Sequence, residues 1–74
     1  MFITLTDIIK NTQIRINTAH IIGYQRNMSV HDGQEYTAVF LTDREVGVIF
    51  VNQSPEQIDK LLGECFITVK PEMT

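Results

Sequence analysis

The stretch that decides the fold reads Ser54-Pro55-Glu56-Gln57-Ile58-Asp59-Lys60-Leu61-Leu62-Gly63, and it follows directly on a run of strand-forming residues. Ser54 is a preferred N-cap residue, and Gln57 completes a capping box with it. Pro55 suits the first helical position, because its missing N–H has no helical partner there. Gly63 is typical of a residue that ends a helix in the left-handed conformation. The sequence therefore predicts one short helix over residues 55–62.

This predicted helix has one apolar side. Ile58, Leu61 and Leu62 recur at helical spacing and form a single stripe. The polar side carries Glu56 and Lys60, which have opposite charge and stand four residues apart, so we expect them to pair. The evident task of such a stripe is to cover a sheet. The helix thus indicates how the fold is built and does not point to a catalytic or binding site.

The two stretches before the helix form the clearest predicted hairpin. They cover residues 36–42 and 46–51, with a turn at residues 43–45. The second stretch is apolar on both faces, with Val46, Val48 and Phe50 pointing one way and Ile49 and Val51 the other. A single helix covers only one face. The other face requires a second layer of sheet, a barrel interior or a partner subunit.

Further strand-like stretches complete the predicted domain. Residues 2–5, 13–17 and 21–24 fit strands, whereas residues 6–11 fit either a strand or a helical turn. Residues 65–70 predict a last strand after the helix. We therefore expect one α+β domain over residues 1–74. It consists of a small, mostly antiparallel curved sheet or open barrel of four to five strands, with one short helix, about 55–62, packed on it.

The segment between residues 25 and 35 is polar, and we predict a connecting loop there. Asp32-Gly33 within it is the strongest two-residue hairpin signal of the chain. A tight hairpin at that point would set Arg26 opposite Val39, which mismatches a charged residue with an apolar one. We therefore expect a mobile loop or a bulge at this connection.

Charge and size limit the classes of function. A chain of 74 residues buries only about 60% of the surface that its unfolded form exposes, so a partner chain would help its stability. The net charge is −3, and the basic residues are scattered along the chain, which disfavours nucleic-acid binding. These basic residues are Lys10, Arg15, Arg26, Arg44, Lys60 and Lys70.

The single cysteine, Cys65, cannot form an internal disulfide, and this favours a reducing compartment. We expect it to act as a small core residue and not as a nucleophile. No apolar run approaches the roughly 18 residues that a membrane-spanning helix needs. The sequence therefore predicts a cytoplasmic protein with no membrane partner.

Catalytic patterns are weak. His31, Asp32 and Glu35 offer three potential metal ligands or an acid and base pair, but we interpret them as a polar loop, since zinc sites show two or more well-spaced His or Cys ligands. The glycines stand singly, so no phosphate-binding loop is predicted. We expect no enzyme activity, no metal site and no cofactor. A minimal hydrolase built on these three residues remains the least favoured hypothesis.

Binding residues tend to lie in polar loops carried by a rigid sheet. We therefore predict that the loop at residues 25–35 and the flanking tyrosines form the partner-binding surface. Its residues are Tyr24, Arg26, His31, Asp32, Glu35 and Tyr36. The same tyrosines permit an alternative, a small-ligand or nucleic-acid binding domain that uses the sheet face near Tyr24 and Tyr36.

Three segments resemble the small FlbD-like flagellar proteins. Residues 16–24, I-N-T-A-H-I-I-G-Y, are similar to the strand-turn-strand motif I-N-x-x-x-I-x-x-[IY] of that family. Residues 37–43 resemble its T-x-I-x-L-T-[ND] strand, and residues 51–62 its V-x-E-S-x-E-E-[IV] helix entry. The chain departs from the family in lacking Pro-Asp after the asparagine and in placing Arg44 where a turn glycine is usual. The resemblance implies a fold and a bacterial or prophage setting, and it supplies no mechanism.

These observations lead to one leading hypothesis. We expect a non-enzymatic protein-interaction module, a small accessory or regulatory protein of bacterial or phage origin. Its expected partners are a second copy of itself, in a homo-oligomer, and another protein. The two-sided apolar strand at residues 46–51 and the small size of the chain support this hypothesis.

Overall fold

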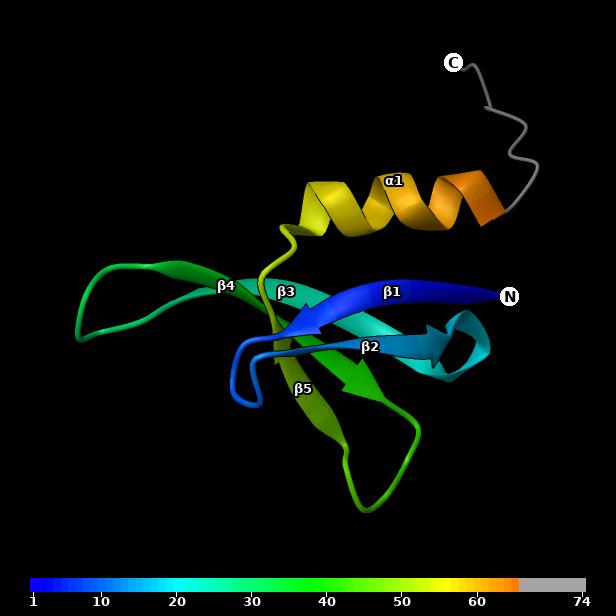
Figure 1. Cartoon of the computed structure of the whole chain (residues 1–74), viewed down its shortest axis with the longest axis horizontal. Helices are drawn as coiled ribbons and strands as arrows, with labels where there is room; N and C mark the ends of the chain where they lie inside the picture. Colours follow the sequence, from blue (N-terminus) through cyan, green and yellow to red (C-terminus); the bar gives the residue numbers. More distant parts are fainter. Residues whose placement is uncertain (66–74) are drawn as a thin grey trace.

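The computed structural model describes residues 1–65, which form a five-stranded antiparallel sheet with one α-helix (Figure 1). In chain order the elements are β1 (Phe2–Asp7), β2 (Thr12–Asn17), the 3₁₀ helix η1 (Thr18–His20), β3 (Ile21–Met28), β4 (Glu35–Leu41), β5 (Val48–Val51) and α1 (Pro55–Cys65). This arrangement confirms the predicted α+β class.

The sheet has the strand order β2-β1-β5-β4-β3. The β1–β2 hairpin joins the β3-β4-β5 meander where Asp7 of β1 pairs with Val51 of β5. β2 and β3 follow one another in the chain yet occupy opposite edges of the sheet, and the three residues of η1 connect them. Such a short connection reaches both edges only if the sheet curls toward closure, as in the predicted curved sheet or open barrel.

The ambiguous stretch at residues 6–11 contains both a strand end and a turn. β1 continues through Asp7, and residues 8–11 then turn the chain into β2. The buried Asp7 side chain holds this turn, since its Oδ1 accepts the backbone N–H groups of Ile9 at 2.9 Å and Lys10 at 3.0 Å. Asn11 completes the turn in the left-handed region, with φ 56°. The turn is therefore fixed by an aspartate that the strand itself supplies.

The predicted loop at residues 25–35 is wrong at both ends. β3 continues to Met28 and β4 begins at Glu35, so the connection covers only residues 29–34. This length shifts the register by two residues from that of a tight turn and sets Tyr24 opposite Val39. Arg26 thereby lies opposite Thr37 and not Val39, which removes the mismatch expected from the sequence. The ladder is irregular at its other end, where the register shifts between Ile21 and Gly23.

The start of α1 confirms the predicted capping box. The Gln57 backbone N–H donates to Ser54 Oγ at 3.1 Å, and the Ser54 N–H donates to Gln57 Oε1 at 2.8 Å. Ile58 is buried completely, and Leu61 and Leu62 pack partly buried against the same core. The other buried apolar residues of that core are Ile3, Leu5, Val39, Ile49 and Val51. The helix therefore covers the face of the sheet that carries Val39 and Val51.

The predicted end of the helix is wrong. α1 runs through Gly63 to Cys65, and Gly63 is not among the residues with positive φ. A glycine inside a helix costs about 1 kcal/mol relative to alanine, which is too little to stop a helix whose stripe is already docked. Cys65 ends the helix and does not begin a strand, and the remainder of the predicted last strand, residues 66–70, lies outside the described residues.

We expect the substitution Ser54→Ala to lower the free energy of unfolding by about 1 kcal/mol, because it removes the acceptor for the Gln57 N–H. Urea denaturation followed by circular dichroism measures this change. Replacing Ser54 by Asp keeps an acceptor and serves as the control, with a loss of stability clearly smaller than that of the alanine variant. Equal losses in the two variants would show that the cap contributes little.

The packing of α1 on the sheet predicts which of two core substitutions lowers the free energy of unfolding more. Ile58→Ala should lower the free energy of unfolding by about 2–5 kcal/mol, since the side chain is buried completely. Leu61→Ala should cost less, because Leu61 is only partly buried at the margin of the same core. Denaturant unfolding of both variants tests the order. A cost for Leu61→Ala that equals or exceeds that for Ile58→Ala would contradict the described docking.

Candidate functional site

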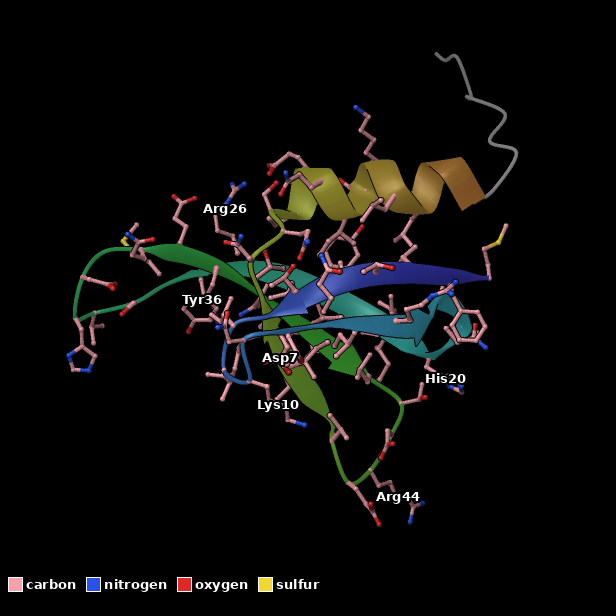
Figure 2. The ribbon with its side chains drawn as sticks, viewed as in Figure 1. Asp7, Lys10, His20, Arg26, Tyr36 and Arg44 are labelled. Atoms are coloured by element: carbon pink, nitrogen blue, oxygen red, sulfur yellow. The ribbon has the colours of Figure 1, made fainter. Side chains whose placement is uncertain are left out.

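Two of the predicted binding residues hold the helix on the sheet. The Tyr24 hydroxyl of β3 donates a hydrogen bond to Asp59 of α1. Arg26, two residues along the same strand, forms an ion pair with Glu56 in the first turn of α1, and its Nε lies 3.5 Å from Oε1 of Glu35. Arg26 lies on the α1 side of the β3–β4 hairpin in Figure 2. Glu56 thus pairs with Arg26 in the described part of the chain, and not with Lys60 as predicted.

The environment of Tyr24 changes its acidity. Burial against α1, together with the hydrogen bond to Asp59 and the negative charge of that carboxylate, raises the pKa of Tyr24 from 10.0 to about 12. The phenol therefore stays protonated as a donor across the physiological range. Its role is to position the helix, because its hydroxyl is already engaged by α1.

His31 and Asp32 lie in the β3–β4 loop, where local contacts engage them. The His31 backbone N–H donates to Ser29 Oγ at 3.2 Å, and Asp32 Oδ1 accepts the Gln34 N–H at 3.0 Å. Glu35 begins β4 and faces Arg26. Among the described side chains, those of residues 1–63, no three His, Cys, Asp or Glu groups gather in a geometry that would hold a metal ion. His31, Asp32 and Glu35, the three potential ligands, are therefore not brought together in such a geometry.

Tyr36 lies on the opposite face of the sheet from Tyr24. Tyr24 pairs with Val39 and Tyr36 with Asn27, and side chains alternate between faces along each strand. The Tyr36 ring meets the ring of Phe50 edge-on, with centroids 5.4 Å apart and planes at 87°. Because the two tyrosines are separated by the sheet, they do not form one platform for stacking bases.

The face that carries Tyr36 is covered by no helix or strand of residues 1–65, and apolar side chains cluster on it. We call it the outer face and define it by Ile8, Ile9, Tyr36, Phe40, Val48 and Phe50. Ile9 is 72% exposed, whereas Phe50 and Tyr36 are half-buried. The turn that carries Ile9 is tied to β5, since the Ile8 N–H donates to the Phe50 carbonyl at 3.0 Å. The isoleucines thus stand on a fixed turn beside the aromatic pair.

Two hollows flank Ile9 and Phe50 on this face. The larger, about 420 Å³, extends toward the β3–β4 hairpin and is lined by Ile8, Ile9, Met28, Ser29, Val30, His31, Tyr36 and Phe50. The smaller, about 200 Å³, extends toward the turn after β4 and includes Val46, Val48 and Lys10. Ile9 and Phe50 line both hollows, so they form a ridge between them. Of the predicted binding residues, Tyr36 and His31 line the larger hollow.

The sequence indicates part of this surface, through Tyr36, Val48 and Phe50, but not the contribution of Ile8 and Ile9. The sequence leaves residues 6–11 open between a strand and a helical turn, although two adjacent isoleucines after Asp7 are an available signal of an exposed apolar site. Met28 and Val30 fall within the predicted polar loop, yet both are exposed apolar residues beside Tyr36. What places these residues together is the pairing of β1 with β5, which no local pattern specifies.

A third hollow, of about 480 Å³, lies where β2, η1 and the end of β4 meet, and we call it the edge hollow. Its lining consists of Phe2, Arg15, Ile16, Asn17, His20, Leu41, Thr42 and Asp43. The Arg15 guanidinium carbon lies 5.5 Å from the centre of the Phe2 ring. His20 Nδ1 is 3.1 Å from Thr42 Oγ1. The edge hollow thus combines apolar walls with a cation and polar groups.

No protein-family model, curated protein or solved structure matches this chain. The resemblance to FlbD-like proteins consequently stays a prediction from the sequence. In the part of the chain that the structure describes, α1 is too short and too polar to cross a membrane.

The raised pKa of Tyr24 predicts a specific loss of stability in alkali. Between about pH 10 and about pH 12 the unfolded chain loses this proton while the folded chain retains it, so the free energy of unfolding falls as the pH rises. Tyr24→Phe should flatten the curve of stability against pH in this interval. Asp59→Asn should flatten it only in part, since burial, the larger cause, remains. Identical slopes in the wild type and the phenylalanine variant would contradict this assignment.

Proposed function

We propose that this chain is a non-enzymatic protein-interaction module that forms a homo-oligomer through its outer face. The observation that carries the proposal is the ridge of Ile9 and Phe50 between two hollows, on the side of the sheet that α1 leaves uncovered. Exposed apolar surface of this kind is rare on monomers and marks interaction sites. The small core of a 74-residue chain gives a further reason for burying this face.

A second copy of the chain is the occupant that the shape favours. In a two-fold interface the same patch must supply both the protrusion and the recess. The outer face has both, since Ile9 protrudes at 72% exposure and the larger hollow beside it is walled by Tyr36 and Phe50. Ile9 of each copy would insert into the larger hollow of the other.

The distribution of charge supports the same occupant. Interface centres are depleted in charged residues, which lie at the rim. Asp7 lines the smaller hollow, but it is buried and its Oδ1 is occupied by the turn N–H groups. The exposed charge near the ridge is Lys10, at the margin of the smaller hollow. Two copies can therefore meet through their ridges without burying a carboxylate.

The non-enzymatic part of the proposal rests on how the polar candidates are used. Asp32 caps its own loop, and Glu35 faces Arg26. Tyr24 and Arg26 position α1. We place the module in the cytoplasm of a bacterium, or of a bacterium carrying a phage, on the basis of the lone cysteine and the FlbD-like resemblance.

The test is a substitution at the ridge with a matched control elsewhere. Size-exclusion chromatography with light scattering should find the wild type as a dimer at high micromolar concentration. Ile9→Lys should convert it to a monomer, because the charge would be buried against the partner. Ile22→Lys is the control, since Ile22 is the same residue type, is similarly exposed at 69% and lies on β3. It should leave the dimer intact.

Folding of the variants is checked in the same samples. Ile9 is mostly exposed, so circular dichroism and the unfolding midpoint of Ile9→Lys should match those of a wild-type sample diluted to monomer. A wild type that stays monomeric at high micromolar concentration would reject the proposal. A folded Ile9→Lys variant that remains dimeric would place the interface elsewhere and would reject it as well.

A further inference from the structure

β2 presents an open strand edge whose backbone groups can be assigned. The Thr6 carbonyl accepts the Asn52 N–H at 3.0 Å, and the Thr6 N–H donates to the Gln53 side chain, so the backbone of Thr6 is directed away from β2. Backbone direction alternates along a strand. The residue opposite Thr6, Gln13, therefore directs its N–H and carbonyl away from β1, and Arg15 does the same. These groups lie on the edge that no strand of the described sheet occupies.

The two edges of the sheet differ in how they are protected. β3 has an irregular register near Ile22, and its Tyr24 and Arg26 side chains are engaged with α1. Irregular register and a covering helix are usual means of blocking an edge against further pairing. β2 has neither, since its pairing with β1 is unbroken from Thr12 to Asn17. The β2 edge is therefore the one that remains competent to add a strand.

The edge hollow lies beside the C-terminal half of this strand. Phe2, Ile16 and Leu41 supply its apolar walls, and Arg15 supplies a permanent positive charge. Asp43 also lines it, but its Oδ1 already accepts the N–H groups of Glu45 and Val46 in the turn after β4. Among residues 1–63, whose side chains the structure describes, Arg15 has no carboxylate within 4.0 Å, and the ion pairs there are those of Arg26. The site therefore combines an open edge, an apolar recess and an available cation.

We propose that the β2 edge binds an extended acidic segment of a partner protein by strand addition. The backbone of the segment pairs with Gln13 and Arg15, as in other cases of β-augmentation. One apolar side chain of the segment enters the edge hollow, and a neighbouring carboxylate contacts Arg15. Alternation along the added strand sends successive side chains to opposite faces, so the recognised pattern is a β-branched or other apolar residue flanked by glutamate or aspartate.

Charge decides between this occupant and a second copy of β2. The strand reads Thr-Gln-Ile-Arg-Ile-Asn and has no acidic residue, so a second β2 brings another arginine and no carboxylate to Arg15. Like charges near one another across a strand pair are destabilising. The outer face joins copies of the chain through different residues. The two sites are therefore separate, and each proposal stands or fails without the other.

The experiment uses the full chain, labelled with ¹⁵N, and a synthetic acetylated and amidated peptide, Thr-Glu-Val-Glu-Val-Thr. Binding should shift the backbone amide signals of Gln13 and Arg15 and leave those of Ile22 and Arg26 on β3 unchanged. A peptide with lysine in place of both glutamates should bind about tenfold or more weakly, because it faces Arg15 with like charge. A peptide N-methylated at alternate residues along its pairing edge should not bind, since it lacks the N–H donors for the ladder.

Variants separate this site from the outer face. Arg15→Glu should weaken binding of the acidic peptide about tenfold or more and improve binding of the lysine peptide. Lys60→Glu makes the same change of charge at an exposed position on α1 and should bind the acidic peptide like the wild type. Ile9→Lys should also bind the peptide normally, even as a monomer.

Several results would overturn the proposal. They are the absence of binding at millimolar peptide, equal binding of the acidic and lysine peptides, binding that survives N-methylation, and unchanged binding by Arg15→Glu. Concentration-dependent shifts of Gln13 and Arg15 in the Ile9→Lys variant without peptide would also overturn it, since they would assign the edge to a second copy.

Discussion

The packing of Ile58, from α1, against the sheet is the contact on which the rest of this structure depends. It places the helix across Leu5, Val39 and Val51, which come from β1, β4 and β5. The pairing of β1 with β5 is short, so the helix reinforces the junction between the β1–β2 hairpin and the meander. One helix covers one face of a small sheet. Because α1 packs on the face that carries Val39 and Val51, the aromatic and aliphatic side chains of the outer face stay on the other side of the sheet.

Polar contacts at the edge of this core fix the direction of the helix. Tyr24 and Arg26 project from neighbouring positions of β3 that share a face, and they contact Asp59 and Glu56 one turn apart on α1. Exposed ion pairs contribute little to stability, typically below about 1 kcal/mol. Their value here is in orientation, because two contacts along β3 allow one angle of the helix. This role also explains why Tyr24 and Arg26, which were expected to bind a partner, contact the helix of their own chain.

The curl of the sheet creates the remaining surface features. Since β2 and β3 do not pair, the sheet formed by residues 1–65 stays open and has two edge strands. The irregular register and the helix contacts protect β3, whereas β2 stays regular and lies beside the edge hollow. The chain thus presents an apolar outer face and an open polar edge on different sides. The two proposed sites share no lining residue, so neither would block the other.

The sequence by itself determined the local elements. The capping box at Ser54, the apolar stripe with Ile58 and the alternation of Ile49 and Val51 with Phe50 each depend on neighbours within a few residues, and each is present in the structure. The fold class followed, because an α+β layer is the simple way to bury one helical stripe and one sheet face. The prediction failed where competing local signals had similar strength. Gly63 is an acceptable helix residue once docking favours the helix, and Asp32-Gly33 gave way to a longer loop because register depends on the partner strand.

Only the tertiary structure decided which surface is available for binding. Local sequence cannot say that the turn with Ile9 lies beside Phe50, since residues some forty positions apart meet through the pairing of β1 with β5. Nor can it say that Tyr24 lies opposite Val39, because that depends on a register set by the length of the loop at residues 29–34. Local hydrogen bonds and side-chain periodicity fix helices and strands, whereas long-range pairing decides which of their faces remains open to solvent.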